Sequence, residues 1–136
     1  MTHACSRAYR PAFPSLPVRL RSADERTEVI TALVDTGADI TFVPTALLEQ
    51  IAARDSTPAQ IRSHFGDVHT VQLYLIGLEI ETLSLPGQYV VGDDTGAEVI
   101  LGRDVLNKLA VFLDGPHERS TLVDDDAIRR FRLRVG

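Results

Sequence analysis

One acidic side chain lies where it could carry out chemistry. Asp35 comes directly after Ala32-Leu33-Val34, a run that is apolar on both sides, as a buried strand would be. An acid at the end of a buried strand is partly removed from water, which suits it to act as a general acid or base. Thr36 can hydrogen-bond the backbone and hold the loop, and Gly37 permits the close approach of another backbone. This arrangement indicates a hydrolytic site with a rigidly held carboxylate.

A single carboxylate cannot both activate a water molecule and protonate the carbonyl group of an amide. Two close carboxylates that share one proton can fill both roles, and their proton losses then belong to the pair. A two-fold axis passing near Asp35 would bring the same residue of a second copy into place. The sequence therefore predicts a homodimer in which each subunit contributes one Asp35.

A second Asp-Thr-Gly-Ala run occurs at residues 94–97. It follows Gly92 and Asp93 instead of an apolar strand, so its acid is expected in a solvated loop. Asp, Thr and Gly are also common residues of polar turns. A chain of 136 residues has no room for two full catalytic lobes. We interpret this second run as a turn and not as a second catalytic motif.

The run from Ala32 to Thr41 resembles the active-site motif of the retropepsins, which are single-domain, homodimeric aspartic proteases of the retroviral type. A second resemblance lies at Ile100-Leu101-Gly102-Arg103, where two apolar residues, a glycine and an arginine precede a short helix. The family resemblance implies an aspartic endopeptidase that hydrolyses peptide bonds of a peptide or protein substrate without a cofactor. It also implies that Arg103 pairs with Asp39.

The resemblance assigns roles to three groups of residues. The catalytic group comprises Asp35, Thr36 and Gly37. A β-hairpin flap is expected over residues 61–70, and its tip is placed by position alone. The substrate-binding group therefore comprises Ala38, Asp39, Ser63, His64, Phe65 and Gly66. Structural support of the site is assigned to Gly102 and Arg103.

Two alternatives to a general endopeptidase stay open. The predicted flap lacks the glycine-rich tip of the viral enzymes, which favours a catalytically inactive binding or dimerisation module on the same fold. The N-terminal arm is rich in proline, which favours a protease that processes only its own precursor or a dedicated partner.

Composition and charge argue against other classes of site. His64 and His69 would point to opposite faces of a strand, and His3 and His117 add no zinc spacing, so no metal site is expected. The net charge of −5 predicts no nucleic-acid partner. We interpret the arginines near the C-terminus as a solvated face or as guards of an edge strand; these are Arg129, Arg130, Arg132 and Arg134.

The expected location is the cytoplasm. The first residues do not form a signal peptide, and no apolar stretch reaches the ~18 residues needed to span a membrane. Cys5 is the only cysteine, so no internal disulfide is possible. No membrane partner is therefore expected.

The pattern of elements predicts a mainly β protein with a closed, retropepsin-like barrel and one or two short helices. Residues 1–17 are expected to form an extended arm because of their three prolines, and residues 18–136 a single domain. Turns are predicted at Gly77 and at Pro86-Gly87, and short helices at 45–54 and 104–109. The tail after residue 124 fits either a strand or a helix with an acidic cap, and we favour the strand.

Overall fold

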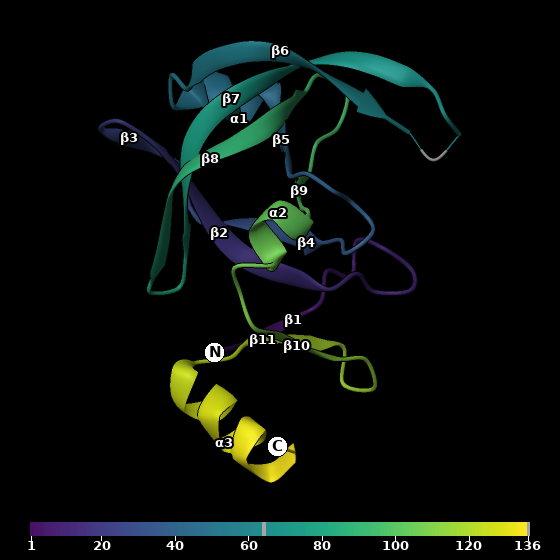
Figure 1. Ribbon diagram of the computed structural model, residues 1–136, viewed down its shortest axis with the longest axis vertical. Coiled ribbons are helices and arrows are strands. Elements are labelled where there is room, and N and C mark those ends of the chain that lie inside the picture. Colours follow the sequence, from purple (N-terminus) through teal and green to yellow (C-terminus); the bar gives the residue numbers. More distant parts are fainter. Residues whose placement is uncertain (64, 136) are drawn as a thin grey trace.

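The computed structural model describes residues 1–63 and 65–135 of the chain, and its centre is a closed barrel of six strands (Figure 1). The barrel closes because the last strand of the series pairs with the first. In their order around the barrel the strands are β2 (Ser15–Ser22), β4 (Ile30–Val34), β9 (Val99–Leu101), β5 (Phe42–Pro44), β8 (Leu83–Asp93) and β7 (Val68–Ile80). The predicted mainly β, closed-barrel fold is confirmed.

The apolar core fills the inside of this barrel. Alternate residues of β2 point inward, so that Leu16, Val18 and Leu20 are almost completely buried. Leu78 and Ile80 of β7 are buried beside them, and Leu20 lies opposite Leu78 where the two strands pair. Each such side chain contributes about 1.5–3 kcal/mol by leaving water, which makes the barrel a firm support for loops at its rim.

Strands β4 and β9 run parallel, which decides where the candidate site forms. Their pairing joins Ala32 to Val99 and Val34 to Leu101. Because parallel strands end at the same edge of a sheet, the residues that follow them emerge side by side. The segments beginning at Asp35 and at Gly102 are therefore neighbours, although they are far apart in the sequence.

A long hairpin projects from the barrel (Figure 1). It is formed by β6 (Arg54–Arg62) and the first part of β7, and the register joins Arg62 to Val68. At its tip the Ser63 N–H donates to the Asp67 carbonyl at 2.8 Å, and Gly66 has a left-handed φ of +86°. His64 lies outside the described residues. The strand β3 (Glu25–Arg26) forms a smaller projection paired with β2.

The predicted turns at Gly77 and Pro86-Gly87 are wrong. β7 continues through Gly77 with a bulge between Ile76 and Leu78, and β8 contains Pro86 and Gly87. Glycine favours such bulges because it has no side chain to obstruct a close approach. The chain reverses instead at residues 81–82, where Glu81 has a left-handed φ of +54°.

Three further strands form a small separate sheet below the barrel (Figure 1). Their order is β1 (Thr2–Ala4), β11 (Arg119–Leu122) and β10 (Val111–Asp114). The start of the chain thus pairs with a strand close to its end. Residues 15–17, which we placed at the end of the extended arm, already belong to β2.

The helices differ from the prediction in length and in number. α1 (Thr45–Gln50) and α2 (Arg103–Leu106) are shorter than expected. The tail forms a third helix, α3 (Asp125–Val135), so the preference for a strand is wrong. Asp124 caps α3, because its carboxylate accepts a hydrogen bond from the Ala127 N–H at 2.8 Å. None of the helices in the described part of the chain is long and apolar enough to cross a membrane.

Candidate active site

The backbone at the rim of the barrel holds Asp35 in a tight loop. The Asp35 N–H donates to the Leu101 carbonyl at 3.0 Å, which continues the pairing of β4 with β9 by one residue. The Asp35 side chain turns back over its own loop, where its Oδ1 accepts a hydrogen bond from the Gly37 N–H at 2.9 Å. A Cβ atom on Gly37 would lie 3.1 Å from that oxygen, so glycine leaves the carboxylate room. Asp35 is half-buried and stays accessible from outside.

Helix α2 fixes the second half of the same loop. The Arg103 N–H donates to the Ala38 carbonyl at 2.8 Å, and the Asp104 N–H donates to the Asp39 carbonyl at 3.3 Å. Directly before the helix, Gly102 passes so close to the loop that a Cβ atom there would lie 2.5 Å from the Ile40 carbonyl oxygen. Only glycine fits this crossing without a shift of backbone.

The ion pair predicted between Arg103 and Asp39 is present. Arg103 also donates a hydrogen bond from Nη1 to the Thr36 carbonyl oxygen at 2.6 Å, so that one guanidinium spans the loop. The Asp39 side chain is 85% exposed and that of Arg103 is 45% exposed, so the pair adds little to stability. Its effect is geometric, because two contacts on one planar group fix the distance between Thr36 and Asp39.

Two supporting residues were missed in the sequence. Thr41 is completely buried, and its hydroxyl donates to Asp104 Oδ1 at 2.8 Å while it accepts from the Gly102 N–H at 3.0 Å. The second oxygen of Asp104 accepts from the Thr41 N–H at 3.2 Å. The only sequence signal was an acid in the first turn of a short helix, and nothing in the sequence connected it with Thr41.

The structure brings together one part of the predicted site and leaves the other part apart. Residues 35–39 lie against Gly102 and Arg103. Ser63, Phe65 and Gly66 lie at the tip of the β6–β7 hairpin, and among the described residues no hydrogen bond or ion pair joins these three to the loop. Phe65 is 93% exposed, so its ring has no cover within the described chain.

The second Asp-Thr-Gly-Ala run is a polar turn, as predicted. Asp93 Oδ1 accepts hydrogen bonds from the backbone N–H groups of Thr95 and Gly96, and Asp94 accepts one from the Thr45 hydroxyl at 2.6 Å. Partial burial raises the pKa of the Asp93 carboxyl, but the hydrogen bonds from Gly96 and Thr95 lower it by more, so that the pKa lies below its ordinary value of 3.8. Both acids of this turn therefore serve local structure.

Across the described ranges, no group of three or more His, Cys, Asp or Glu side chains is arranged to hold a metal ion. The loop at residues 35–39 offers a carboxylate that accepts a hydrogen bond from the backbone N–H of Gly37.

Comparison with known protein families finds a match that includes this loop. Residues 25–108 match the model of the family described as "gag-polyprotein putative aspartyl protease". The chain belongs to this family. The matched segment of this aspartyl protease family includes both the loop at Asp35 and the support at Gly102 and Arg103. It ends before β10, β11 and α3.

Among solved structures, the chain is similar to the EIAV protease complexed with the inhibitor HBY-793. The two are 20% identical, with a TM-score of 0.56, and the match covers 71% of this chain and 86% of that chain. At this identity the likeness shows the retroviral protease fold and nothing finer. No curated protein sequence matches the chain.

Proposed function

We propose that the protein is an aspartic endopeptidase whose active site forms when two copies bring their Asp35 carboxylates together. The observation that supports this most strongly is the loop at residues 35–39, whose backbone is held by β9 and α2 while its carboxylate stays accessible. Such rigidity suits a group that must keep its position throughout a reaction. Membership of an aspartyl protease family supports the same chemistry.

The proposed mechanism uses the two Asp35 carboxylates as a pair with one shared proton. The ionised member accepts a proton from a water molecule, whose oxygen attacks the carbonyl carbon of the peptide bond. The protonated member donates its proton to the carbonyl oxygen, which yields a neutral tetrahedral intermediate. Transfer of a proton to the amide nitrogen then allows the carbon–nitrogen bond to break. Because one member must be ionised and the other protonated, we expect a pH optimum on the acid side.

The β6–β7 hairpin is proposed to act as a flap over the substrate. An extended peptide would bind as an added strand between the loop at residues 35–39 and the flap. Closing of the flap would exclude bulk water from the carboxylate pair. The exposed ring of Phe65 fits this role, because it offers apolar surface at the tip that contact with a substrate or a second subunit would cover.

The test is the variant Asp35→Asn, assayed with a mixed peptide library. We expect kcat/KM to fall by roughly a thousandfold or more while the far-ultraviolet circular dichroism spectrum stays unchanged. Because the site is shared, an excess of folded variant chains should also reduce the activity of a fixed amount of wild-type protein. Full activity of the variant would contradict the assignment of Asp35.

A structure of the dimer would test the geometry directly. We expect the two Asp35 carboxylates to approach within roughly 2.6–3.2 Å, the range of a hydrogen bond. A wide separation in the only dimer that forms would favour a binding or dimerisation module without turnover.

A further inference from the structure

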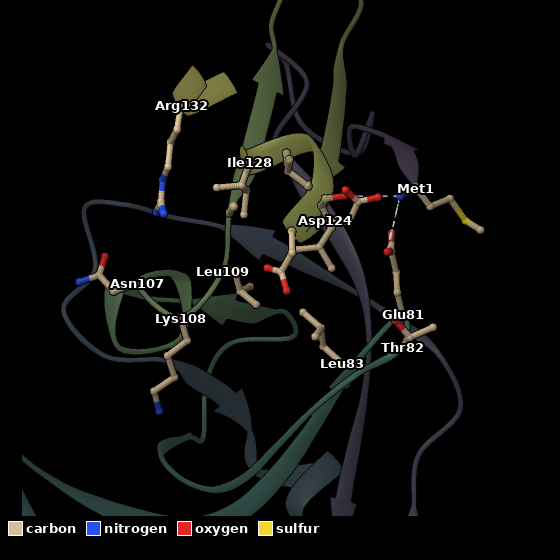
Figure 2. Close-up of a pocket in the computed structure, with 14 residues that line it drawn as sticks. Met1, Glu81, Thr82, Leu83, Asn107, Lys108, Leu109, Asp124, Ile128 and Arg132 are labelled. Carbon is tan, nitrogen blue, oxygen red and sulfur yellow. Dashed lines mark hydrogen bonds and ion pairs between the residues drawn. The ribbon is translucent and has the colours of Figure 1, made fainter. Parts of the chain in front are cut away.

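Helix α3 lies at the end of the molecule farthest from the barrel (Figure 1). Two hollows adjoin it and share part of their lining, including Ile128 and Arg132. One hollow, of about 620 Å³, lies between the helix, the β7–β8 turn and the segment after α2. Figure 2 shows Ile128, Leu109 and Leu83 around it, with Arg132 on one side and the contact of Met1 with Glu81 on the other. Asp35 does not line this hollow, so it is distinct from the candidate active site.

The second hollow, of about 630 Å³, has apolar surface that the described part of the chain leaves uncovered. It is formed by β10 and α3, and its lining includes Phe112, Ile128 and Phe131. Phe112 is 59% exposed and Phe131 is 65% exposed. Two neighbouring aromatic rings in water form the kind of patch that normally contacts a partner.

The charges on α3 indicate which partner fits. Its first turn is acidic, with Asp125 and Asp126 following the cap at Asp124, and the basic residues come later at Arg129, Arg130 and Arg132. All of these side chains are exposed, and no ion pair engages them in the part of the chain that the structure describes. One end of the helix therefore complements the other end in charge.

A helix of this kind is complementary to a reversed copy of itself. Asp125 and Arg132 are about two turns apart, so they lie on nearly the same side of the helix, beside the stripe formed by Ile128 and Phe131. When a second copy is rotated about a two-fold axis, the acidic end of each helix lies against the basic end of the other. The apolar stripes then face each other, and the two Asp125–Arg132 pairs lie along one side of this contact.

We propose that α3 pairs in an antiparallel manner with α3 of a second copy of this chain, and that this pairing stabilises the dimer. The inference deepens the proposed function and rests on it, because that function needs two copies to complete one carboxylate pair. A second copy is favoured over an unrelated partner because the charge pattern matches itself. The family match covers residues 25–108, so α3 lies outside the matched segment.

The experiment compares two charge-reversed variants by sedimentation equilibrium. In the first, Asp125→Lys reverses the acidic charge beside the stripe; in the second, Arg132→Glu reverses the basic charge. Each variant alone should dimerise at least about tenfold more weakly than the wild type, because both Asp125–Arg132 pairs of the dimer become repulsive. A mixture of equal amounts should regain dimerisation close to that of the wild type, since the reversed charges of the two variants are opposite in sign.

A matched control changes the same amount of charge at another place. Asp24→Lys alters one exposed acid beside β3, and should leave dimerisation as in the wild type. Phe131→Glu tests the apolar stripe separately and should weaken the dimer by tenfold or more. Mixing this variant with either charge-reversed variant should not restore dimerisation.

The outcomes separate this inference from the proposed function. The charge pattern also favours an isolated helix through its dipole, and if that is its only role, the mixture will dimerise no better than each variant alone. That result, or a wild-type dimer unaffected by all α3 variants, would overturn the helix pairing and leave the protease assignment intact. A wild type that stays monomeric at every concentration, with no cleavage of peptides, would overturn both.

Discussion

The chain contains the sequence Asp-Thr-Gly-Ala twice, at residues 35–38 and 94–97, and the two copies differ in almost every structural respect. The first follows β4, whose neighbour β9 accepts the Asp35 N–H through the Leu101 carbonyl. The second follows the end of β8, and its hydrogen bonds stay within the turn or reach the side chain of Thr45. Identical residues thus give a supported loop in one place and an exposed turn in the other.

The difference shows that the site is made by what lies behind the motif. Arg103, Gly102 and Asp104 all come from the segment after β9, and they contact residues 36–41 through backbone and side chain. The turn at residues 94–97 is held instead by the side chain of Asp93 and by the hydrogen bond from the Thr45 hydroxyl to Asp94. A sequence motif therefore indicates a candidate acid, and the parallel pairing of β4 with β9 provides its support.

The largest contrast should appear in catalysis. Asp35→Asn and Asp94→Asn make the same chemical change in the same four-residue motif. We expect the first to lower kcat/KM for peptide cleavage by roughly a thousandfold or more and the second to change it less than about threefold. An equal loss of activity in both variants would show that the second motif also serves the reaction, and would contradict the assignment of different roles to the two motifs.

A large contrast in stability is expected at the glycines. Gly102→Ala would place a Cβ atom 2.5 Å from the Ile40 carbonyl oxygen, and backbone cannot move aside without disturbing the loop. We expect it to lower the free energy of unfolding by about 3 kcal/mol, measured by urea denaturation. In Gly96→Ala the atoms nearest to the new Cβ belong to the Asp93 carboxylate, which can rotate away. The expected loss of unfolding free energy is therefore about 1 kcal/mol. Equal losses of unfolding free energy in the two variants would mean that the loop at Asp35 accommodates an added methyl group as easily as the turn at residues 94–97.

A smaller contrast is expected at the threonines. Thr41→Val keeps the shape of a buried side chain but leaves the Gly102 N–H without its acceptor, which should cost about 2 kcal/mol of unfolding free energy. Thr95→Val removes one exposed hydrogen bond to Asp93, and should lower the free energy of unfolding by less than about 0.5 kcal/mol. A Thr41→Val protein as stable as the wild type would show that the buried hydroxyl is not a support of the loop.

Sequence patterns were sufficient for the barrel and for the position of the loop. Buried strands such as Ala32-Leu33-Val34 are apolar on both sides, and the context of each Asp-Thr-Gly-Ala run distinguished a strand end from a polar turn. Thr41 and Asp104 could not be predicted to meet, because they are distant in sequence and only the folded barrel brings them together. Local patterns carry no information about such contacts.

The predictions of secondary structure are wrong where pairing between distant strands, or the lack of a partner strand, outweighs the local preference of the residues. Glycine at position 77 favours a turn in the sequence, but this residue pairs with Arg21 where β7 closes the barrel against β2. The alternation of Phe131, Leu133 and Val135 favours a strand in the tail, yet no strand is paired with it among the described residues. Without a partner strand, the cap at Asp124 decides in favour of a helix.

The smallest predicted effect concerns pH and the second motif. Because the pKa of Asp93 is lower in the folded chain than its ordinary value of 3.8, its hydrogen bonds stabilise the fold fully above that value. The contribution is lost as the pH falls through the lowered pKa. We expect the wild type to lose under about 1 kcal/mol of stability from this source in acid, since the group is near the surface. In the Asp93→Asn variant, the free energy of unfolding should therefore fall less steeply as the pH is lowered below about 4, which urea denaturation at several pH values would measure. If the free energy of unfolding falls equally with pH in both proteins, this turn contributes no acid sensitivity.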